Sequence, residues 1–85
     1  MPHQREQQMI REKLAAYAHN AWSGWMKYMF SKSTINADGT VTIPKSLVDR
    51  WMRQMTTCYN DLPESEKASD RKEADEMLAI TGVAA

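Results

Sequence analysis

The stretch YNDLPESEKASDRKEA, residues 59–74, decides how this chain is divided into helices. Cys58–Leu62 reads as a turn, and Pro63 follows at a position typical of the first turn of a helix, where no N–H partner is needed. Glu64 and Glu66 complement the positive end of the helix dipole. The sequence therefore predicts a turn and then a C-terminal helix. That helix is expected to fade near Thr81-Gly82.

Two further helices are predicted upstream, because apolar residues recur there at spacings of three and four. The first covers about residues 5–30 and the second covers residues 44–57. Between them, Asn36–Gly39 has turn chemistry, and Thr40–Ile43 alternates like a short strand. We therefore expect a mainly α fold, a compact three-helix domain with a short hairpin or an extended loop between the first and second helices.

Each predicted helix has an apolar stripe that is expected to face inward. The stripe of the first helix comprises Ile10, Leu14, Tyr17, Ala18, Ala21, Trp22, Trp25 and Met29. The stripe of the second comprises Leu47, Val48, Trp51, Met52 and Met55. In the third, the inner face comprises Ala74, Met77 and Leu78, with Ala68 and Arg71 as further candidates.

The length of 85 residues predicts a single domain, 1–85, with a core of about residues 5–80 and frayed termini, Val83–Ala85 among them. A chain of this size buries only about 60% of its unfolded surface, which is close to the limit of independent stability. Oligomerisation is one way to add buried area, so we expect a homo-oligomer, most simply a dimer.

The charges balance overall but differ between the two ends of the chain. Eleven basic and eleven acidic residues give a net charge of zero, which argues against a dedicated nucleic-acid binder. Residues 1–58 hold eight Lys and Arg against four Asp and Glu, whereas residues 59–85 hold three against seven. The acidic C-terminal helix is therefore either simply solvated or docked on a basic surface, within the chain or on a second subunit.

Other features point to a cytoplasmic protein. The single Cys58 excludes an internal disulfide and a cysteine-based zinc site. The first eight residues contain no apolar run, so we expect no secretory signal. No stretch approaches the roughly 20 apolar residues that a membrane span requires.

The candidate binding residues fall into two groups. His19 and Trp22 are three residues apart and share a helical face. They form either one wall of a ligand site or a core tryptophan beside a locally hydrogen-bonded histidine. Trp51 and Tyr59 are likewise candidate core anchors, although the hydroxyl of Tyr59, just before the turn, could instead reach a pocket.

Lys67, Asp70 and Arg71 form the second group. Lys67 and Arg71 are four residues apart, so they project together as a clamp suited to phosphate or carboxylate. Asp70 could hold the arginine or accept a hydrogen bond from a ribose hydroxyl. The alternative is a solvated helix with an internal ion pair of little energetic consequence, such as one among Glu66, Asp70 and Arg71.

Little in the sequence favours catalysis or a bound metal. His19 is the only histidine within the three predicted helices, since His3 is expected in the N-terminal tail, and no nucleophile stands in a strained turn. Asp70, Glu73 and Asp75 lack a repeated ligand spacing. We therefore expect no enzymatic activity, no catalytic residue, no metal site and no cofactor.

At these positions the chain resembles the RyR domain, a small module repeated in ryanodine receptors and found singly in bacterial and phage proteins. His19-Asn20-Ala21-Trp22 is similar to the first family element. Residues 59–71, with the pattern Tyr-x-x-Leu-Pro-x-x-x-Lys-x-x-Asp-Arg, and the following Ala74 are similar to the second. The family's aromatic loop after the first helix has a different sequence here. The resemblance covers roughly residues 15–80.

The resemblance implies a compact, mostly helical fold of the short phage or prophage type. It also implies a nucleotide-derived or other phosphorylated ligand. In that arrangement Lys67 and Arg71 would hold phosphate, and Trp22 or Tyr59 would stack on the base. A phage-encoded protein of this kind would sequester a nucleotide signal in the host cytoplasm without cleaving it. The competing hypothesis is a protein-interaction adaptor that binds a host protein through a Met- and Trp-rich face.

Overall fold

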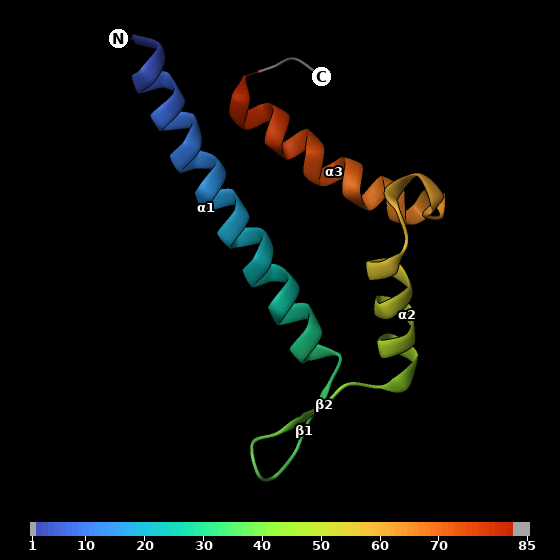
Figure 1. Ribbon diagram of the computed structural model, residues 1–85. Coiled ribbons are helices and arrows are strands. Elements are labelled where there is room, and N and C mark those ends of the chain that lie inside the picture. The colour runs from blue at the N-terminus through green and yellow to red at the C-terminus, as the bar shows by residue number, and fades with distance from the viewer. Residues whose placement is uncertain (1, 83–85) are drawn as a thin grey trace. The chain divides into compact units, whose positions relative to one another are not determined.

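The structure is a computed structural model and describes residues 2–82 of the chain. The predicted frayed residues 83–85 lie outside the described residues. Figure 1 shows the order of the elements along the chain. They are α1 (Pro2–Ser31), β1 (Thr34–Ile35), β2 (Val41–Thr42), α2 (Lys45–Thr56), a 3₁₀ helix (Tyr59–Asp61) and α3 (Glu64–Thr81). The predicted mainly α fold, with a hairpin between the first two long helices, is confirmed.

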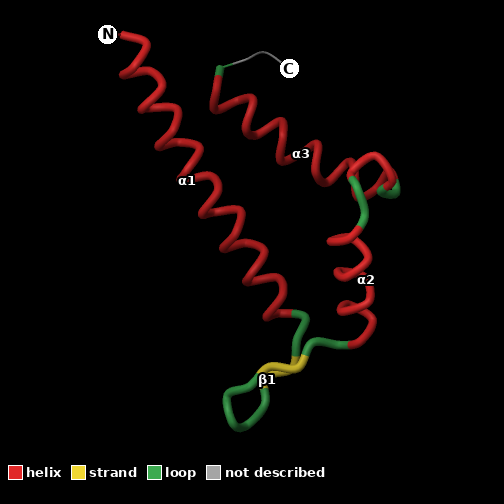
Figure 2. The backbone as a smooth tube through the Cα atoms, viewed as in Figure 1, coloured by secondary structure: helices red, strands yellow, loops and turns green. Residues whose placement is uncertain are grey.

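The hairpin settles an alternative that the sequence left open. β1 and β2 pair antiparallel, with Thr34 opposite Thr42 and Ile35 opposite Val41 (Figure 2). Each strand has only two residues, so the ladder adds few hydrogen bonds, and the turn between the strands contributes most of the local order.

Side chains of the turn hold the hairpin closed. The carboxylate of Asp38 accepts hydrogen bonds from the backbone N–H of Thr40 at 3.0 Å and from the Thr40 hydroxyl at 2.6 Å. Asn36 donates from Nδ2 to the hydroxyls of Thr40 and Thr42 at 2.9 and 3.0 Å. Gly39 has a φ of 88°, a conformation that side chains disfavour. These bonds lower the pKa of Asp38, and the hydroxyl of Thr40 is the largest cause.

A proline precedes each of the helices α2 and α3. Short polar side chains bond to the last carbonyls of α1 and α2. Pro44 and Pro63 stand at the N-cap positions of α2 and α3, within one residue of the predicted starts. At the end of α1, the hydroxyl of Ser33 donates to the carbonyl of Met29 at 2.7 Å. At the end of α2, the hydroxyl of Thr56 bonds a carbonyl in the same way. α3 ends at Thr81, and the following Gly82 has a φ of 78°, the left-handed conformation common after helices.

The chain folds as two compact units, and the boundary between them falls inside α1. The terminal unit comprises the chain up to Ala21 together with the chain from Pro63 onward, and the central unit comprises Trp22–Leu62. Among the described residues, none is fully buried in either unit. The two units therefore hold their apolar residues at half-buried or exposed positions.

The predicted apolar stripes are only partly turned inward. Half-buried stripe residues are Ile10, Leu14, Tyr17, Ala21, Met29, Leu47, Trp51 and Leu78. Exposed stripe residues are Ala18, Trp22, Trp25, Val48, Met52, Met55, Ala74 and Met77, and the candidates Ala68 and Arg71 are exposed as well. The prediction that whole stripes face inward is thus wrong for these exposed residues. Each stripe is wider than the surface that the neighbouring elements of the same unit can cover.

Candidate functional site

The six predicted binding residues are divided between the two units. His19, Lys67, Asp70 and Arg71 belong to the terminal unit, whereas Trp22 and Tyr59 belong to the central unit. All except Lys67 are exposed. A single pocket built from all six residues therefore stays a prediction.

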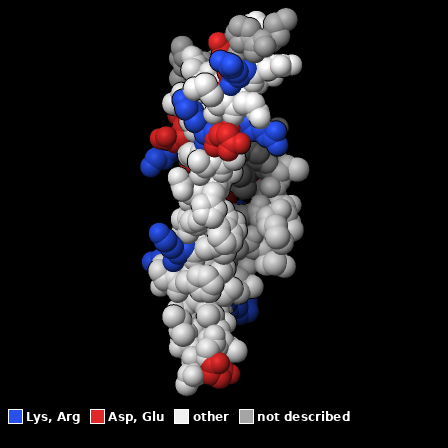
Figure 3. Space-filling model, turned by 90° about the vertical axis from the view of Figure 1, so that its left-hand side faces the viewer, with Lys and Arg blue, Asp and Glu red and all other residues white. Residues whose placement is uncertain are grey.

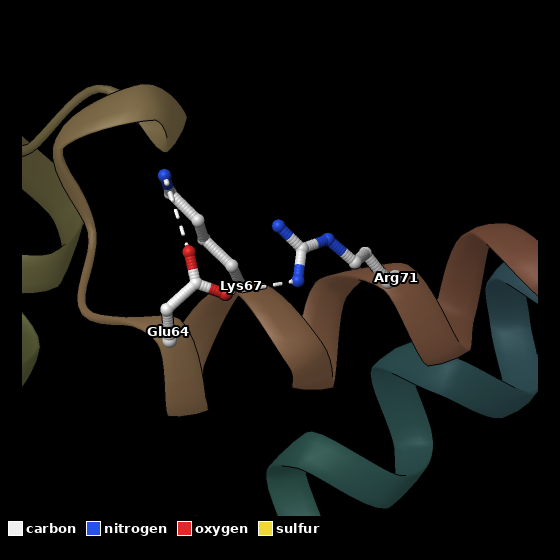
Figure 4. A network of polar contacts seen from close by, with 3 residues as sticks. All are labelled: Glu64, Lys67 and Arg71. Atoms are coloured by element: carbon white, nitrogen blue, oxygen red, sulfur yellow. Dashed lines mark hydrogen bonds and ion pairs between the residues drawn. The ribbon is translucent and has the colours of Figure 1, made fainter.

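Within the terminal unit, two of these residues meet at one carboxylate. Lys67 Nζ lies 3.8 Å from Oε1 of Glu64, and Arg71 donates from a terminal nitrogen to Oε2 of Glu64 at 3.1 Å. Figure 4 shows the two cationic groups reaching different oxygens of this carboxylate. Lys67 and Arg71 thus project together, as their spacing of four residues predicts.

Burial differs strongly within this cluster. The side chain of Lys67 is 18% exposed, that of Arg71 is 53% exposed and that of Glu64 is 77% exposed. The pair of Arg71 with Glu64 joins two exposed side chains and contributes only about 0–1 kcal/mol, because water screens the charges. Both cations therefore converge on a carboxylate that is itself largely open to solvent.

Glu64 was not among the residues predicted for the site. The sequence assigned it only to the helix dipole, yet its carboxylate is the point on which the two cations converge. The spacing contained a signal, since residues three and seven positions apart lie on one face of a helix. Glu64 precedes Lys67 by three residues and Arg71 by seven.

The central unit contains an aromatic cluster that joins α1 to α2. The rings of Trp25 and Tyr28 have centroids 6.0 Å apart and planes at 89°, and those of Tyr28 and Trp51 are 6.4 Å apart at 61°. Edge-to-face pairs of this kind contribute about 0.5–1.5 kcal/mol beyond the area they bury. Lys32 Nζ lies 5.7 Å from the centre of the Tyr28 ring, within cation–π range. Tyr28, which lies outside the predicted stripe, therefore contacts α2 through the ring of Trp51.

Several large apolar side chains on the two helices of the central unit are exposed. They include Trp22, Trp25 and Phe30 from α1, and Val48, Met52 and Met55 from α2. The exposed fractions of these six range from 39% for Val48 to 71% for Met55. On the face drawn in Figure 3, large areas carry no charged group. Exposed aromatic and methionine residues in this number are typical of surfaces that bind other proteins.

We name the exposed large apolar residues of α2 the α2 seam, which consists of Val48, Met52 and Met55. They follow one another at spacings of four and three residues, so they lie in a row along one face of the helix. Leu47 and Trp51, on the adjoining part of the apolar arc, are half-buried. The apolar arc of α2 is therefore wide enough to contact two neighbours, and within the central unit one part of it is covered.

One open hollow of about 450 Å³ occurs on the N-terminal part of α1. It is lined by Gln4, Arg5, Gln8 and Met9, which all come from this one helix. None of the predicted binding residues contributes to it. A hollow formed by a single helix face encloses little, so it adds no support to the predicted ligand site.

The described side chains offer few groups for metal or thiol chemistry. Within residues 2–82, no group of three or more His, Cys, Asp or Glu side chains is placed to hold a metal ion. Cys58 is a free, exposed thiol. Among the helices that the structure describes, none combines the length and the apolar character that crossing a membrane requires.

Comparisons with protein-family models, with curated proteins and with solved structures find no match to this chain. The resemblance to the RyR domain, and everything that it implies about ligands, therefore stays a prediction. The geometry of the chain itself is the remaining guide to its function.

Proposed function

We propose that this chain is a non-enzymatic protein-binding module and that it acts through the exposed apolar residues of the central unit. The observation that supports this most strongly is the segment Trp22–Phe30, in which six of nine residues are large and apolar. Three of them, Trp22, Trp25 and Phe30, are exposed by about half or more. A helix that is apolar around most of its circumference is normally buried.

The neighbouring helix covers only one side of this segment. Tyr28 meets Trp51 of α2, whereas Trp22 remains 60% exposed. Aromatic residues and methionine are enriched in protein–protein interfaces, and tryptophan is prominent among the residues that dominate binding energy. Methionine adds a flexible side chain that adapts to the shape of a partner. The composition of the exposed set is thus that of an interface.

The row formed by the α2 seam indicates the kind of partner. Apolar residues at alternating spacings of three and four are the pattern through which one helix packs on another. We therefore propose that the partner presents a helix with an apolar stripe, and that this helix lies along Val48, Met52 and Met55.

A photo-crosslinking experiment tests the proposal. A photoreactive benzoylphenylalanine placed at Met55 should give a discrete covalent adduct with a protein when cells producing the chain are irradiated. The same group placed at Lys72, an exposed residue of α3, serves as the control. Mass spectrometry then identifies both polypeptides in the adduct and the crosslinked residues.

An adduct that forms from Met55 and not from Lys72, and that maps to a helix of the captured protein, would support the proposal. The proposal fails if position 55 yields no protein adduct, or if positions 55 and 72 yield the same set of adducts. The latter result would show that exposure alone explains the labelling.

A second candidate function is binding of a nucleotide or another phosphorylated small molecule, as the resemblance to the RyR domain implies. It is favoured by the convergence of Lys67 and Arg71 on two oxygens of one carboxylate. A phosphate group offers oxygens to both cations in the same way. In this case the chain would act as a cytoplasmic ligand-binding module of the phage type, without turnover.

Thermal unfolding in the presence of a nucleoside diphosphate tests this second function. A ligand at 100 times its dissociation constant adds about 2.7 kcal/mol to the free energy of unfolding. The double variant Lys67→Met, Arg71→Met should lose that gain while staying folded, whereas Lys72→Met should keep it. If nucleotides leave the melting temperature of the unmodified chain unchanged, the nucleotide hypothesis is wrong.

A further inference from the structure

We infer that the partner of the α2 seam is a second copy of this chain, placed by a twofold axis that passes beside Met52. This inference rests on the proposed protein-binding function and names the partner for the same surface. It is supported by the exposed area of the chain, by the charges beside the seam and by the order of the three seam residues.

The exposed area exceeds what two compact units would leave. The chain has an accessible surface of 7113 Å² and a mass of 9.8 kDa. A compact unit of half that mass exposes about 3,100 Å², so two of them expose about 6,200 Å² even when they do not touch. The accessible surface of the chain is therefore about 900 Å² larger than that of two compact units. An interface of standard size removes about 800 Å² from each partner, so one contact with a second copy would account for the excess.

The low burial of the apolar residues also favours a partner that is always present. Since no described residue is fully buried, the units lack a core of their own. Small chains without a sufficient core commonly gain stability by oligomerisation. A second copy is produced together with the first, so the covering surface exists whenever the chain folds.

The charges beside the seam allow it to face itself. Lys45 and Asp49 precede Val48 and Met52 by three residues each, so they line one edge of the seam. Lys45 Nζ lies 2.7 Å from a carboxylate oxygen of Asp49, and the two charges compensate each other within one copy. The seam residues themselves carry no charge. Two seams can therefore meet without bringing uncompensated like charges together, as a twofold interface requires.

The order of the residues sets the register of the contact. Val48 and Met55 are seven residues apart, about 10 Å along the helix, and Met52 lies between them. When two copies of α2 pack antiparallel, Val48 of one copy lies near Met55 of the other. Met52 then lies beside its own counterpart at the axis.

Charge substitutions at Met52 test this arrangement by light scattering. The unmodified chain should have twice the mass of the 9.8 kDa chain. Met52→Glu and Met52→Lys should each weaken the dimer at least about thirtyfold, the effect expected for a central interface residue. An equimolar mixture of the two variants should regain the dimer mass, because opposite charges then meet at the axis. The rescue also shows that the variants remain folded, and far-UV circular dichroism checks each of them alone.

Met77→Glu is the matched control, because Met77 is an exposed methionine of similar exposure in the terminal unit. This variant should remain dimeric. Failure of the mixture to associate, or an equal effect of Met77→Glu, would overturn the placement of the axis. A monomeric unmodified chain that still crosslinks from Met55 to a different protein overturns this inference and leaves the proposed function standing. A monomer without any crosslink overturns both.

Discussion

Replacing Trp51 with alanine should destabilise the chain by about 2 kcal/mol. Truncating a fully buried tryptophan costs about 3–5 kcal/mol. Trp51 is half-buried, so roughly half of that cost is expected. Part of the loss comes from its edge-to-face pair with Tyr28, whose ring centre is 6.4 Å away. Such a pair contributes about 0.5–1.5 kcal/mol beyond the buried area.

A double-mutant cycle isolates the contribution of the pair. The free energy of unfolding is measured in urea by far-UV circular dichroism for the unmodified chain, Trp51→Ala, Tyr28→Ala and the double variant. All four are measured at one protein concentration, because association would otherwise shift the apparent stability. We expect a coupling energy between Trp51 and Tyr28 of about 0.5–1.5 kcal/mol.

A second cycle supplies the control. Ile35 lies in β1 and is 71% exposed, so Trp51→Ala and Ile35→Ala should act additively within about 0.3–0.5 kcal/mol. Additive behaviour of Trp51 and Tyr28 themselves would show that the rings do not meet in solution. The contact that joins α1 to α2 would then be wrong.

Substitutions at two glycines, at Thr40 and at Glu64 probe local features of the chain. Gly24→Ala should raise the free energy of unfolding by about 1 kcal/mol, because the position is helical and has open space around an added Cβ. Gly39→Ala should lower it by about 1 kcal/mol through its φ of 88°, and urea unfolding measures both. Thr40→Val removes the hydroxyl that most lowers the pKa of Asp38, so that pKa should rise toward its ordinary value in an NMR titration of the carboxyl carbon. Because the pKa of Asp38 is lower in the folded chain than in the unfolded chain, the stabilisation from Asp38 is present above the ordinary pKa and is lost as pH falls through the folded value. An unchanged pKa of Asp38 in Thr40→Val would show that the Thr40 hydroxyl is not the cause. Glu64→Gln should change the free energy of unfolding by no more than about 1 kcal/mol. The same variant should bind inorganic pyrophosphate more strongly in calorimetry, since the competing carboxylate is gone. Weaker binding would show that Glu64 does not compete with the phosphate.

The helices and the hairpin could be predicted because their signals are local. Pro44 and Pro63 mark the starts of α2 and α3, and the turn residues Asn36–Gly39 are the ones that close the hairpin. The start of α1 at Pro2 was missed by three residues, because polar residues at a helix end leave no apolar period to follow.

Burial could not be predicted in the same way. Periodicity identifies an apolar arc, but it does not say which part of a wide arc meets a neighbour. On α2, Leu47 and Trp51 are half-buried whereas Met52 and Met55 are exposed, although all four belong to one predicted stripe. Tyr28 was missed for a related reason, since its role depends on a contact with a residue 23 positions away.

The candidate site was predicted in part. The spacing of Lys67 and Arg71 indicated that they would project together, and both do reach Glu64. Whether an aromatic wall faces them depends on long-range contacts of Trp22 and Tyr59, which spacing along the sequence does not determine. The sequence does not single out Glu64, because the helix dipole already explains an acidic residue in the first turn of α3.

The exposed methionines of the α2 seam also make this surface sensitive to oxidants. Met55 is 71% exposed, so its thioether is open to peroxide, and the sulfoxide that forms is polar where the thioether was apolar. Oxidation of Met55 would therefore remove the apolar character of the seam without any change in sequence, and methionine sulfoxide reductases would restore it. The same chemistry makes each seam methionine a natural footprinting probe, since a thioether covered by a partner reacts more slowly than one that remains open to solvent.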